Sequence, residues 1–418
     1  MKNTPINPST KAHSLLGVVF TVAIVGGGIF NLYVEGPSLE AGLAAIPAPE
    51  SLEGAREATQ ALSALAETHL AGKHRAWAAH AWLQQRLGKM EMNGFSVIKA
   101  PDGKLYRGGL FPIRTDDAEI LADDLVVFAE AARETGARFL YLGTPGTVLI
   151  GADHLPESMP YNDYNPVMDS LLFELREKDV AFLDSRYAFL AHGVAREGAP
   201  ARTSFAPDGE AAFALFTSLV DGLERRFSLR LDPERFYRNP ANYEFDRHPD
   251  FFIGQLGKET GPAFSGLDSF VAVKPSFDTD FAIESVDMFG TETSAEGGIE
   301  KTLLHPDALV FYDDLYSLYP EGYYVHTNAS WSKVVNRQKP DGLKVLVVHD
   351  FQIAQIIGHL APMFSEIHTL SLHPNRPFNA SEYIRDYDFD LVIAAFFPQN
   401  LLMPETRALI GTDEREEE

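Results

Sequence analysis

Hydrophobic and polar positions alternate at helical and strand spacing over two long stretches of the chain. In the first, amphipathic patterns predict helices over 117–134, 166–178 and 207–226, and short apolar runs predict strands over 138–142 and 180–183. Strands separated by helices of this length are typical of βαβ units, in which the strands run parallel. The first stretch therefore predicts an α/β fold.

The second stretch begins with a buried strand over 344–348, which ends at the polar pair His349-Asp350. A helical segment, an apolar segment over 365–370 and a strand over 389–396 follow. In open α/β sheets, ligands and catalytic groups gather at the carboxyl ends of the strands. The pattern thus predicts a mostly parallel sheet flanked by helices, with its functional site near His349 and Asp350.

The region 227–342, between the two stretches, interrupts this alternation. It is rich in Tyr and Phe and contains no long helical pattern, apart from a short one near 299–304. We interpret it as a β-rich insertion whose aromatic side chains either form the core of a β layer or stack on sugar rings. Further upstream, strand patterns on both sides of the turn Asp102-Gly103 predict a hairpin.

The N-terminal region contains a candidate membrane anchor. Positions 14–34 carry no charged residue, and this length spans a bilayer as a helix. Lys2 and Lys11 precede the segment and Glu35 follows it, which places the N-terminus in the cytoplasm and the rest of the chain outside it. The alternatives are a cleaved signal peptide and a buried helix. We expect an inner-membrane protein with a single span and its main domain in the periplasm.

The predicted organisation follows from these patterns. It comprises a cytoplasmic stub and transmembrane anchor over 1–36, a linker and helical stalk over 37–93, the first part of the α/β domain over 94–226, the β-rich insertion over 227–342, the second part of the α/β domain over 343–405, and an acidic tail over 406–418.

Composition narrows the function classes. The 418 residues are 45 % hydrophobic and 22 % charged, as in globular proteins. The net charge of −24 argues against nucleic acid as a partner, and the absence of cysteine excludes disulfides and thiol chemistry. The thirteen histidines show no metal-ligand spacing, and no glycine-rich phosphate loop lies outside the predicted anchor. We therefore expect neither a metal nor another cofactor.

Four sequence blocks carry a family resemblance. They are the hairpin at 101–106, the strand at 139–145 with the downstream segment 154–156, the helix start at 206–211, and the segment 345–350 with its continuation at 360–368. These blocks resemble the SGNH-hydrolase-like proteins of bacterial polysaccharide O-acetylation, the alginate O-acetyltransferase group. The resemblance implies an SGNH-like α/β fold and a role in exopolysaccharide acetylation. It also implies two partners, a polysaccharide and a membrane-bound O-acyltransferase.

The block at 345–350 corresponds to the family's Gly-Asp-Ser-Phe block, whose serine accepts an acetyl group. Without gaps, Asp350 matches the family's aspartate, but Phe351 stands for the serine and His349 for the glycine. With a deletion of one residue, Phe351 matches the family's phenylalanine and the serine is absent. Neither alignment supplies the nucleophile that serine acyl transfer requires.

The family's second block, Asp-x-His-Trp, supplies the base and the residue that orients it. Here Arg202 stands for the aspartate, Ser204 for the histidine and Phe205 for the tryptophan. Nucleophile, base and orienting acid are therefore all replaced, and we assign no catalytic residue. The tripeptide Asp268-Ser269-Phe270 repeats the lost motif, but no buried strand precedes it, and we interpret it as coincidental.

Four residues at the two blocks remain as candidate binding residues: Arg202, Ser204, His349 and Asp350. Each has a structural alternative: Asp350 can cap the following helix, and Ser204 can cap the helix near Pro207. The sequence thus leaves three hypotheses. The first is an inactive SGNH-like protein that binds a glycan or a partner in exopolysaccharide acetylation. The second is an active O-acetyltransferase or esterase with non-standard residues, and the third is an envelope-assembly scaffold.

Overall fold

The computed structural model describes residues 73–412, apart from 110–116, 147, 149–158, 162, 193–200, 312–313, 373–377 and 402, together with residues 44, 46 and 61. The chain divides into two compact units, Met1–His80 and Ala81–Glu418. The predicted anchor over 14–34 lies outside the described residues, as do most of the predicted stalk and half of the predicted acidic tail. No helix among the described residues is long and apolar enough to cross a membrane.

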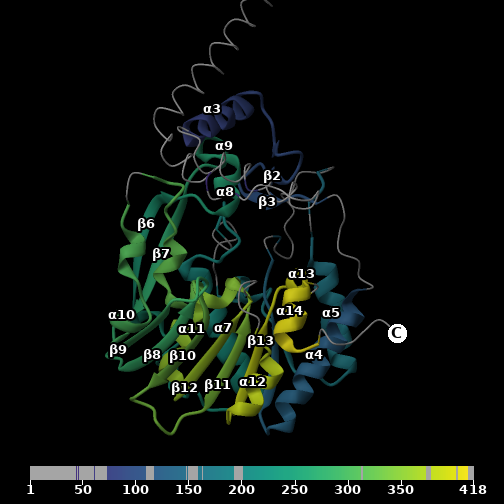
Figure 1. Cartoon of the computed structure of the whole chain (residues 1–418), viewed down its shortest axis with the longest axis vertical. Coiled ribbons are helices and arrows are strands. Elements are labelled where there is room, and N and C mark those ends of the chain that lie inside the picture. The colour runs from purple at the N-terminus through teal and green to yellow at the C-terminus, as the bar shows by residue number, and fades with distance from the viewer. Residues whose placement is uncertain are drawn as a thin grey trace, which may run out of the picture. The chain divides into compact units, whose positions relative to one another are not determined.

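A mixed sheet of eight strands forms the centre of the unit Ala81–Glu418 (Figure 1). In order across the sheet, the strands are β5 (Phe182–Asp184), β4 (Arg138–Gly143), β13 (Leu391–Ala395), β11 (Lys344–His349), β12 (Glu366–Ser371), β10 (Ala329–Asn336), β8 (Phe281–Asp287) and β9 (Glu292–Gly297). Neighbouring strands run parallel from β5 to β12, whereas β10, β8 and β9 continue the sheet with antiparallel pairings. The α/β fold predicted from the alternating pattern, with its mostly parallel sheet and flanking helices, is confirmed.

Helices cover both faces of the parallel part of the sheet. Along β11, Val345 and Val347 pack in one core cluster with the helices α7 (Gly209–Phe227) and α11 (Ala354–Leu360). Leu346 and Val348 pack in another cluster with α4 (Asp117–Glu134) and α5 (Asn165–Glu177). Alternate side chains of a strand point to opposite faces, and here both faces are buried, so the strand is a continuous apolar run. This is why β11 could be recognised in the sequence.

Helix α7 (Gly209–Phe227) fixes the position of the loop that leads into the site. Asp208 is its N-cap and accepts a hydrogen bond of 2.7 Å from the backbone N–H of Ala211. The prediction that Ser204 caps this helix is therefore wrong, because the backbone does not become helical until after Asp208. Ser204 is left free for another contact.

The region 227–342 contributes to two sheets. Strands β6 and β7 pair antiparallel as a two-stranded sheet of their own, whereas β8, β9 and β10 extend the central sheet. Part of the predicted insertion is thus continuous with the α/β core. Buried aromatic residues such as Phe281 and Tyr324 belong to the large core cluster, so most of the aromatic pattern serves packing.

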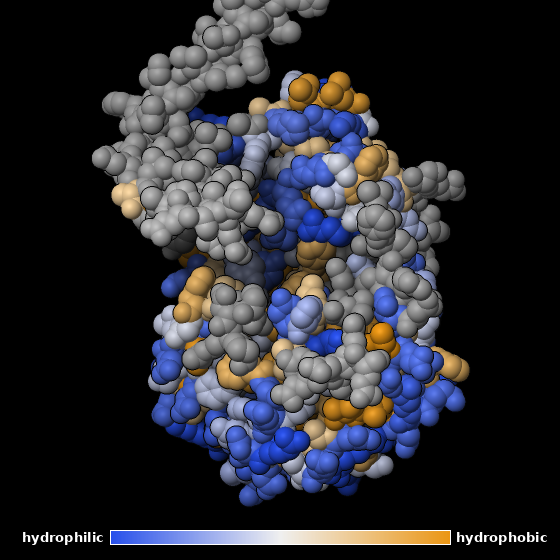
Figure 2. All heavy atoms as spheres, turned by 45° about the vertical axis from the view of Figure 1, so that its right-hand side comes forward, coloured by the Kyte–Doolittle hydropathy of each residue, from blue (hydrophilic) through white to orange (hydrophobic). Residues whose placement is uncertain are grey.

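The described surface is mainly polar on the face shown in Figure 2. Hydrophilic residues cover most of the described part of the face in Figure 2, with separate hydrophobic patches between them.

The strands are β1 (Glu91–Met92), β2 (Val97–Lys99), β3 (Leu105–Arg107), β4 (Arg138–Gly143), β5 (Phe182–Asp184), β6 (Tyr243–Phe252), β7 (Asp268–Pro275), β8 (Phe281–Asp287), β9 (Glu292–Gly297), β10 (Ala329–Asn336), β11 (Lys344–His349), β12 (Glu366–Ser371) and β13 (Leu391–Ala395). The α-helices are α3 (Lys73–Arg86), α4 (Asp117–Glu134), α5 (Asn165–Glu177), α6 (Ala188–Ala191), α7, α8 (Gln255–Thr260), α9 (Pro262–Ser265), α10 (Ile299–Thr302), α11 (Ala354–Leu360), α12 (Ala380–Asp386), α13 (Pro398–Leu401) and α14 (Pro404–Ile410). Short 3-10 helices include η4 (Pro320–Tyr323), η5 (Val325–Thr327) and η6 (Phe351–Ile353).

Candidate functional site

A cavity of about 460 Å³ lies beyond the carboxyl ends of β11 and β13. Its lining comes from segments that are far apart in the sequence: the loop before α7, the helix α8, the region of η4 and η5, and the segments that follow β11 and β13. It is lined by Arg107, Tyr164, Ser204, Phe205, Ala206, Ile253, Gly254, Gln255, Lys258, Tyr319, Glu321, Thr327, Phe351, Gln355, Phe397 and Asn400.

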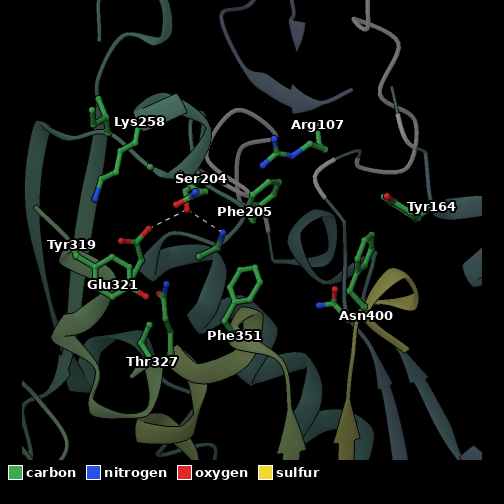
Figure 3. Close-up of a pocket in the computed structure, with 16 residues that line it drawn as sticks. Arg107, Tyr164, Ser204, Phe205, Lys258, Tyr319, Glu321, Thr327, Phe351 and Asn400 are labelled. Carbon is green, nitrogen blue, oxygen red and sulfur yellow. Dashed lines mark hydrogen bonds between the residues drawn. The ribbon is translucent and has the colours of Figure 1, made fainter. Parts of the chain in front are cut away.

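Aromatic rings form much of the wall of this pocket (Figure 3). The rings of Phe205 and Phe351 meet edge to face with their centroids 6.5 Å apart, and the guanidinium of Arg107 lies 5.5 Å from the Phe205 ring centroid. Phe351 is 45 % exposed, so its ring faces the open side of the site. Such apolar faces favour ligands with flat or hydrophobic surfaces.

A polar group of side chains faces these rings. Ser204 Oγ donates a hydrogen bond of 3.0 Å to Glu321 Oε1, and the backbone N–H of Ala206 donates one of 3.3 Å to Ser204 Oγ. Burial raises the pKa of the Glu321 carboxyl, although the Ser204 hydrogen bond and the charge of Lys258 act in the opposite direction. The pocket therefore contains a hydroxyl paired with an unusually basic carboxylate.

Lys258 brings a positive charge to the same part of the pocket. Its Nζ donates a hydrogen bond of 2.9 Å to the backbone oxygen of Leu318. Burial lowers the pKa of this lysine, while the nearby carboxylates of Glu321 and Asp314 raise it. Within the described ranges, no group of three or more His, Asp or Glu side chains is placed to hold a metal ion.

The loop that carries Ser204 is held by the buried carboxylate of Asp268 at the start of β7. Asp268 accepts hydrogen bonds from the backbone N–H of Arg202 at 2.9 Å, from that of Thr203 at 2.7 Å, and from the Thr203 hydroxyl. Thr203 in turn accepts from the backbone N–H of Gly254 at 2.7 Å. The loop before α7, the start of α8 and β7 are thereby joined at one point.

The tripeptide Asp268-Ser269-Phe270 therefore has a structural role through Asp268, although it is not a nucleophile motif. Asp268 is buried and structural, whereas Ser269 is exposed and its Oγ accepts a hydrogen bond of 3.3 Å from the backbone N–H of Asp250. Sequence reasoning missed the role of Asp268 because its partners lie about 65 positions away.

Two of the predicted binding residues lie behind the pocket. His349 is fully buried, its Nδ1 lies 2.6 Å from the backbone oxygen of Asp350, and burial lowers its pKa to about 4. Asp350 accepts hydrogen bonds from the backbone N–H of Phe397 at 2.9 Å and from Asn400 Nδ2 at 2.8 Å. Asp350 thus orients two residues that line the pocket.

Asp350 directly precedes the 3-10 helix η6 and not α11, whose N-cap position is Ile353 without a side-chain cap. That Asp350 caps the helix beginning at Phe351 stays a prediction.

Arg202, the third candidate, points away from the cavity. Its guanidinium donates to the backbone oxygen of Leu267 and packs against Gly103 and Gly266. Gly266 has a φ of +74°, and a Cβ there would lie 2.7 Å from Arg202 Nη2, so a side chain at this position would be strained and would displace the guanidinium. Of the four predicted binding residues, Ser204 alone lines the pocket.

Several lining residues were not predicted from the sequence. Lys258, Tyr319 and Glu321 belong to the region 227–342, where no motif marks them. One feature of the sequence could have marked Glu321: it is the single acidic residue in the aromatic segment 319–324. An acidic residue is rarely buried among aromatic residues unless it has a partner.

Fold and pocket together define an α/β protein whose site lies at the tip of a central parallel strand. The loop with Ser204 and Phe205 lies across the pocket from Phe351, which follows the tip of β11. The family resemblance implies the same arrangement, in which the two sequence blocks meet at one site. In neither alignment, however, does a serine follow Asp350: Phe351 occupies that position.

Comparisons with known proteins agree with this class. No protein-family model and no curated protein sequence matches the chain. Among solved structures, PatB1 of Bacillus cereus, in a structure with a sulfonyl adduct, is 16 % identical with a TM-score of 0.62; the match covers 76 % of this chain and 99 % of that one. A DHHW family protein from Eubacterium siraeum is 14 % identical with a TM-score of 0.53, covering 75 % of this chain and 97 % of that one. These likenesses confirm the predicted SGNH-like resemblance at the level of the fold.

Proposed function

We propose that this protein binds a glycan in the pocket at the tip of β11 and takes part in polysaccharide O-acetylation. In this proposal no acetyl group is carried at the strand tip. The observation that carries it is the position of Phe351, whose partly exposed ring lines the pocket directly after His349 and Asp350.

The chemistry of the lining supports the loss of the family's acyl-transfer route. A phenyl ring has no atom that can accept an acyl group, and none of the pocket-lining residues is a histidine that could act as its base. Arg202, which stands for the orienting aspartate, is bound to the backbone on the far side of the loop.

The same lining supports carbohydrate recognition. Sugar rings have apolar faces and polar edges, and the pocket offers Phe205, Phe351 and Tyr319 for the faces and Glu321 and Lys258 for the hydroxyl groups. A volume of about 460 Å³ falls in the range of pockets for small ligands.

The cellular context of the proposal rests on the sequence blocks and on the fold. We propose that residues 14–34 anchor the protein in the inner membrane with the α/β domain in the periplasm. There it would meet its polysaccharide and a membrane-bound O-acyltransferase. The particular polymer, with alginate as the first candidate, is part of the proposal.

Replacement of Phe351 by alanine tests glycan binding. We expect the affinity for oligosaccharides of the polymer to fall roughly 5- to 30-fold, because a stacking surface worth about 1–2 kcal/mol is removed. Titration calorimetry of the full-length protein with alginate oligosaccharides, and with cello-oligosaccharides for comparison, measures this change.

Phe289→Ala is the matched control, because Phe289 is 84 % exposed at the turn between β8 and β9 and does not line the pocket. Equal affinities of the Phe351→Ala and Phe289→Ala variants would contradict binding in this pocket. If the wild-type protein bound none of the oligosaccharides, the scaffold hypothesis would replace the proposed function.

A further inference from the structure

We propose that Ser204 and Glu321 form a nucleophile–base pair that acts on carboxylic esters in this pocket. The reactive serine would then lie on the wall opposite the tip of β11, at the position where the related family has its histidine. This inference goes beyond the proposed function, but it rests on the same pocket.

The geometry of the pair is that of a serine held for proton transfer. Ser204 Oγ lies 3.0 Å from Glu321 Oε1, within the range in which a base accepts a proton directly. The N–H of Ala206 donates to the same oxygen, which leaves the hydroxyl proton directed at Glu321. Both side chains border the cavity, yet Ser204 is only 6 % exposed and Glu321 8 %. The pair is therefore open to a ligand and shielded from bulk water.

Rigid support distinguishes this serine from an ordinary surface hydroxyl. Asp268 holds the two residues before Ser204 through three hydrogen bonds. Gly254 packs so closely on the loop that a Cβ there would lie 2.5 Å from Ser204 Cβ. Ser204 therefore has little freedom to move away from Glu321. Fixed orientation of a nucleophile against its base is what an acyl transfer requires.

The environment of Glu321 suits a general base. A glutamate in water is too weak a base for a serine hydroxyl near neutral pH, and burial raises the pKa of this carboxyl. Lys258 extends toward the same side of the pocket (Figure 3) and carries three N–H donors, one of which is bound to the backbone oxygen of Leu318. Its charge lowers the pKa of Glu321 against the larger effect of burial, and it is available to stabilise an oxyanion.

The reaction balances without a further reagent. Ser204 Oγ attacks the ester carbonyl carbon while its proton passes to Glu321, and Lys258 stabilises the resulting oxyanion. The carbon–oxygen bond to the alcohol then breaks, and the alcohol leaves with the proton from Glu321. A water molecule attacks the acyl–Ser204 ester, gives its proton to Glu321, and releases the carboxylic acid as Ser204 recovers its proton. A sugar hydroxyl in place of water would make the second step an acyl transfer.

Hydrolysis of p-nitrophenyl acetate by the full-length protein tests the inference. We expect turnover in the wild type and a loss of at least 100-fold in the Ser204→Ala and Glu321→Gln variants. Ser269→Ala is the matched control, because Ser269 is exposed on β7 and does not line the pocket; its rate should equal that of the wild type. The wild-type rate should rise with pH through one ionisation above the usual pKa of glutamate, and Glu321→Gln should abolish this dependence.

A second measurement on the wild-type protein avoids any question of misfolded variants. Diethyl p-nitrophenyl phosphate should label Ser204, as identified by peptide mass spectrometry. Wild-type turnover no faster than that of Ser204→Ala, or labelling at other residues only, would overturn the inference.

The two proposals can fail separately. Glycan binding without ester turnover would remove the Ser204–Glu321 inference and retain the proposed function. Turnover without glycan binding would retain the inference and remove the proposed function.

Discussion

Replacement of Asp268 by alanine is expected to lower the free energy of unfolding by about 3–4 kcal/mol and to abolish binding and turnover in the pocket. The variant removes the acceptor of three hydrogen bonds and leaves the buried N–H group of Thr203 and the partly buried N–H group of Arg202 without this partner. Each buried donor that loses a charged acceptor costs about 1–3 kcal/mol. Urea unfolding followed by circular dichroism measures the stability.

The neighbouring Ser269→Ala variant is the control, and its free energy of unfolding should change by less than about 0.5 kcal/mol, since Ser269 is exposed. The pocket should respond as well, because Asp268 holds the loop that presents Ser204. A stable Asp268→Ala protein with normal ligand affinity would show that the loop does not depend on this carboxylate.

Replacement of His359 by phenylalanine is expected to make the protein less sensitive to acid. His359 is 2 % exposed, and neither of its ring nitrogens has a hydrogen-bond partner among the described residues. It lies among the rings of Phe213, Phe216 and Tyr243, with centroids 5.5–5.6 Å away. Burial lowers its pKa to about 4, so the folded protein keeps this ring neutral.

The direction of the effect follows from proton binding in the two states. Between pH 6.5 and 4 the unfolded chain, with a histidine pKa of about 6.5, binds a proton that the folded protein does not. The contribution of His359 to stability is thus retained above about pH 6.5 and falls as the pH is lowered toward 4. At pH 5, about 1.5 units below the unfolded pKa, the loss is about 2 kcal/mol relative to pH 7.5.

The quantity to measure is the difference in unfolding free energy between His359→Phe and wild type at pH 7.5 and at pH 5. We expect this difference to increase by about 2 kcal/mol in favour of the variant at the lower pH. Other groups titrate in this range: Asp208, whose pKa burial raises to about 6, has the opposite slope. Both proteins share these groups, so their effects cancel. Parallel pH profiles would show that His359 does not control the acid response.

The sequence predicted the elements of the α/β core well, because their patterns are local. Helix α4 begins and ends at the predicted residues, and β11 was visible as an apolar run because both of its faces are buried. Helix α7 begins two residues later than predicted, since Asp208 and not Ser204 caps it. The arrangement of the region 227–342 was harder to predict from the sequence. Strand pairing decides whether a β segment joins the central sheet or forms another sheet, and the pairing partners are distant in sequence.

At the candidate site, too, the sequence predicted local features but not the contacts between distant segments. The two blocks and the strand tip were located from the sequence, and Ser204 does line the pocket. His349 and Asp350 were placed at the right end of the strand, but only the tertiary structure shows that they are buried behind the cavity.

By itself, the sequence determined that this is an α/β protein, and it predicted a site at the tip of β11 with Phe351, not a serine, after Asp350. Periodicity and motifs are properties of neighbouring residues, so the chain displays them directly. Only the tertiary structure decided what chemistry the pocket offers. Ser204 and Glu321 are 117 positions apart, and no local pattern joins them. Folding brings the loop before α7 against η4, and the burial created there gives the Glu321 carboxyl its raised pKa.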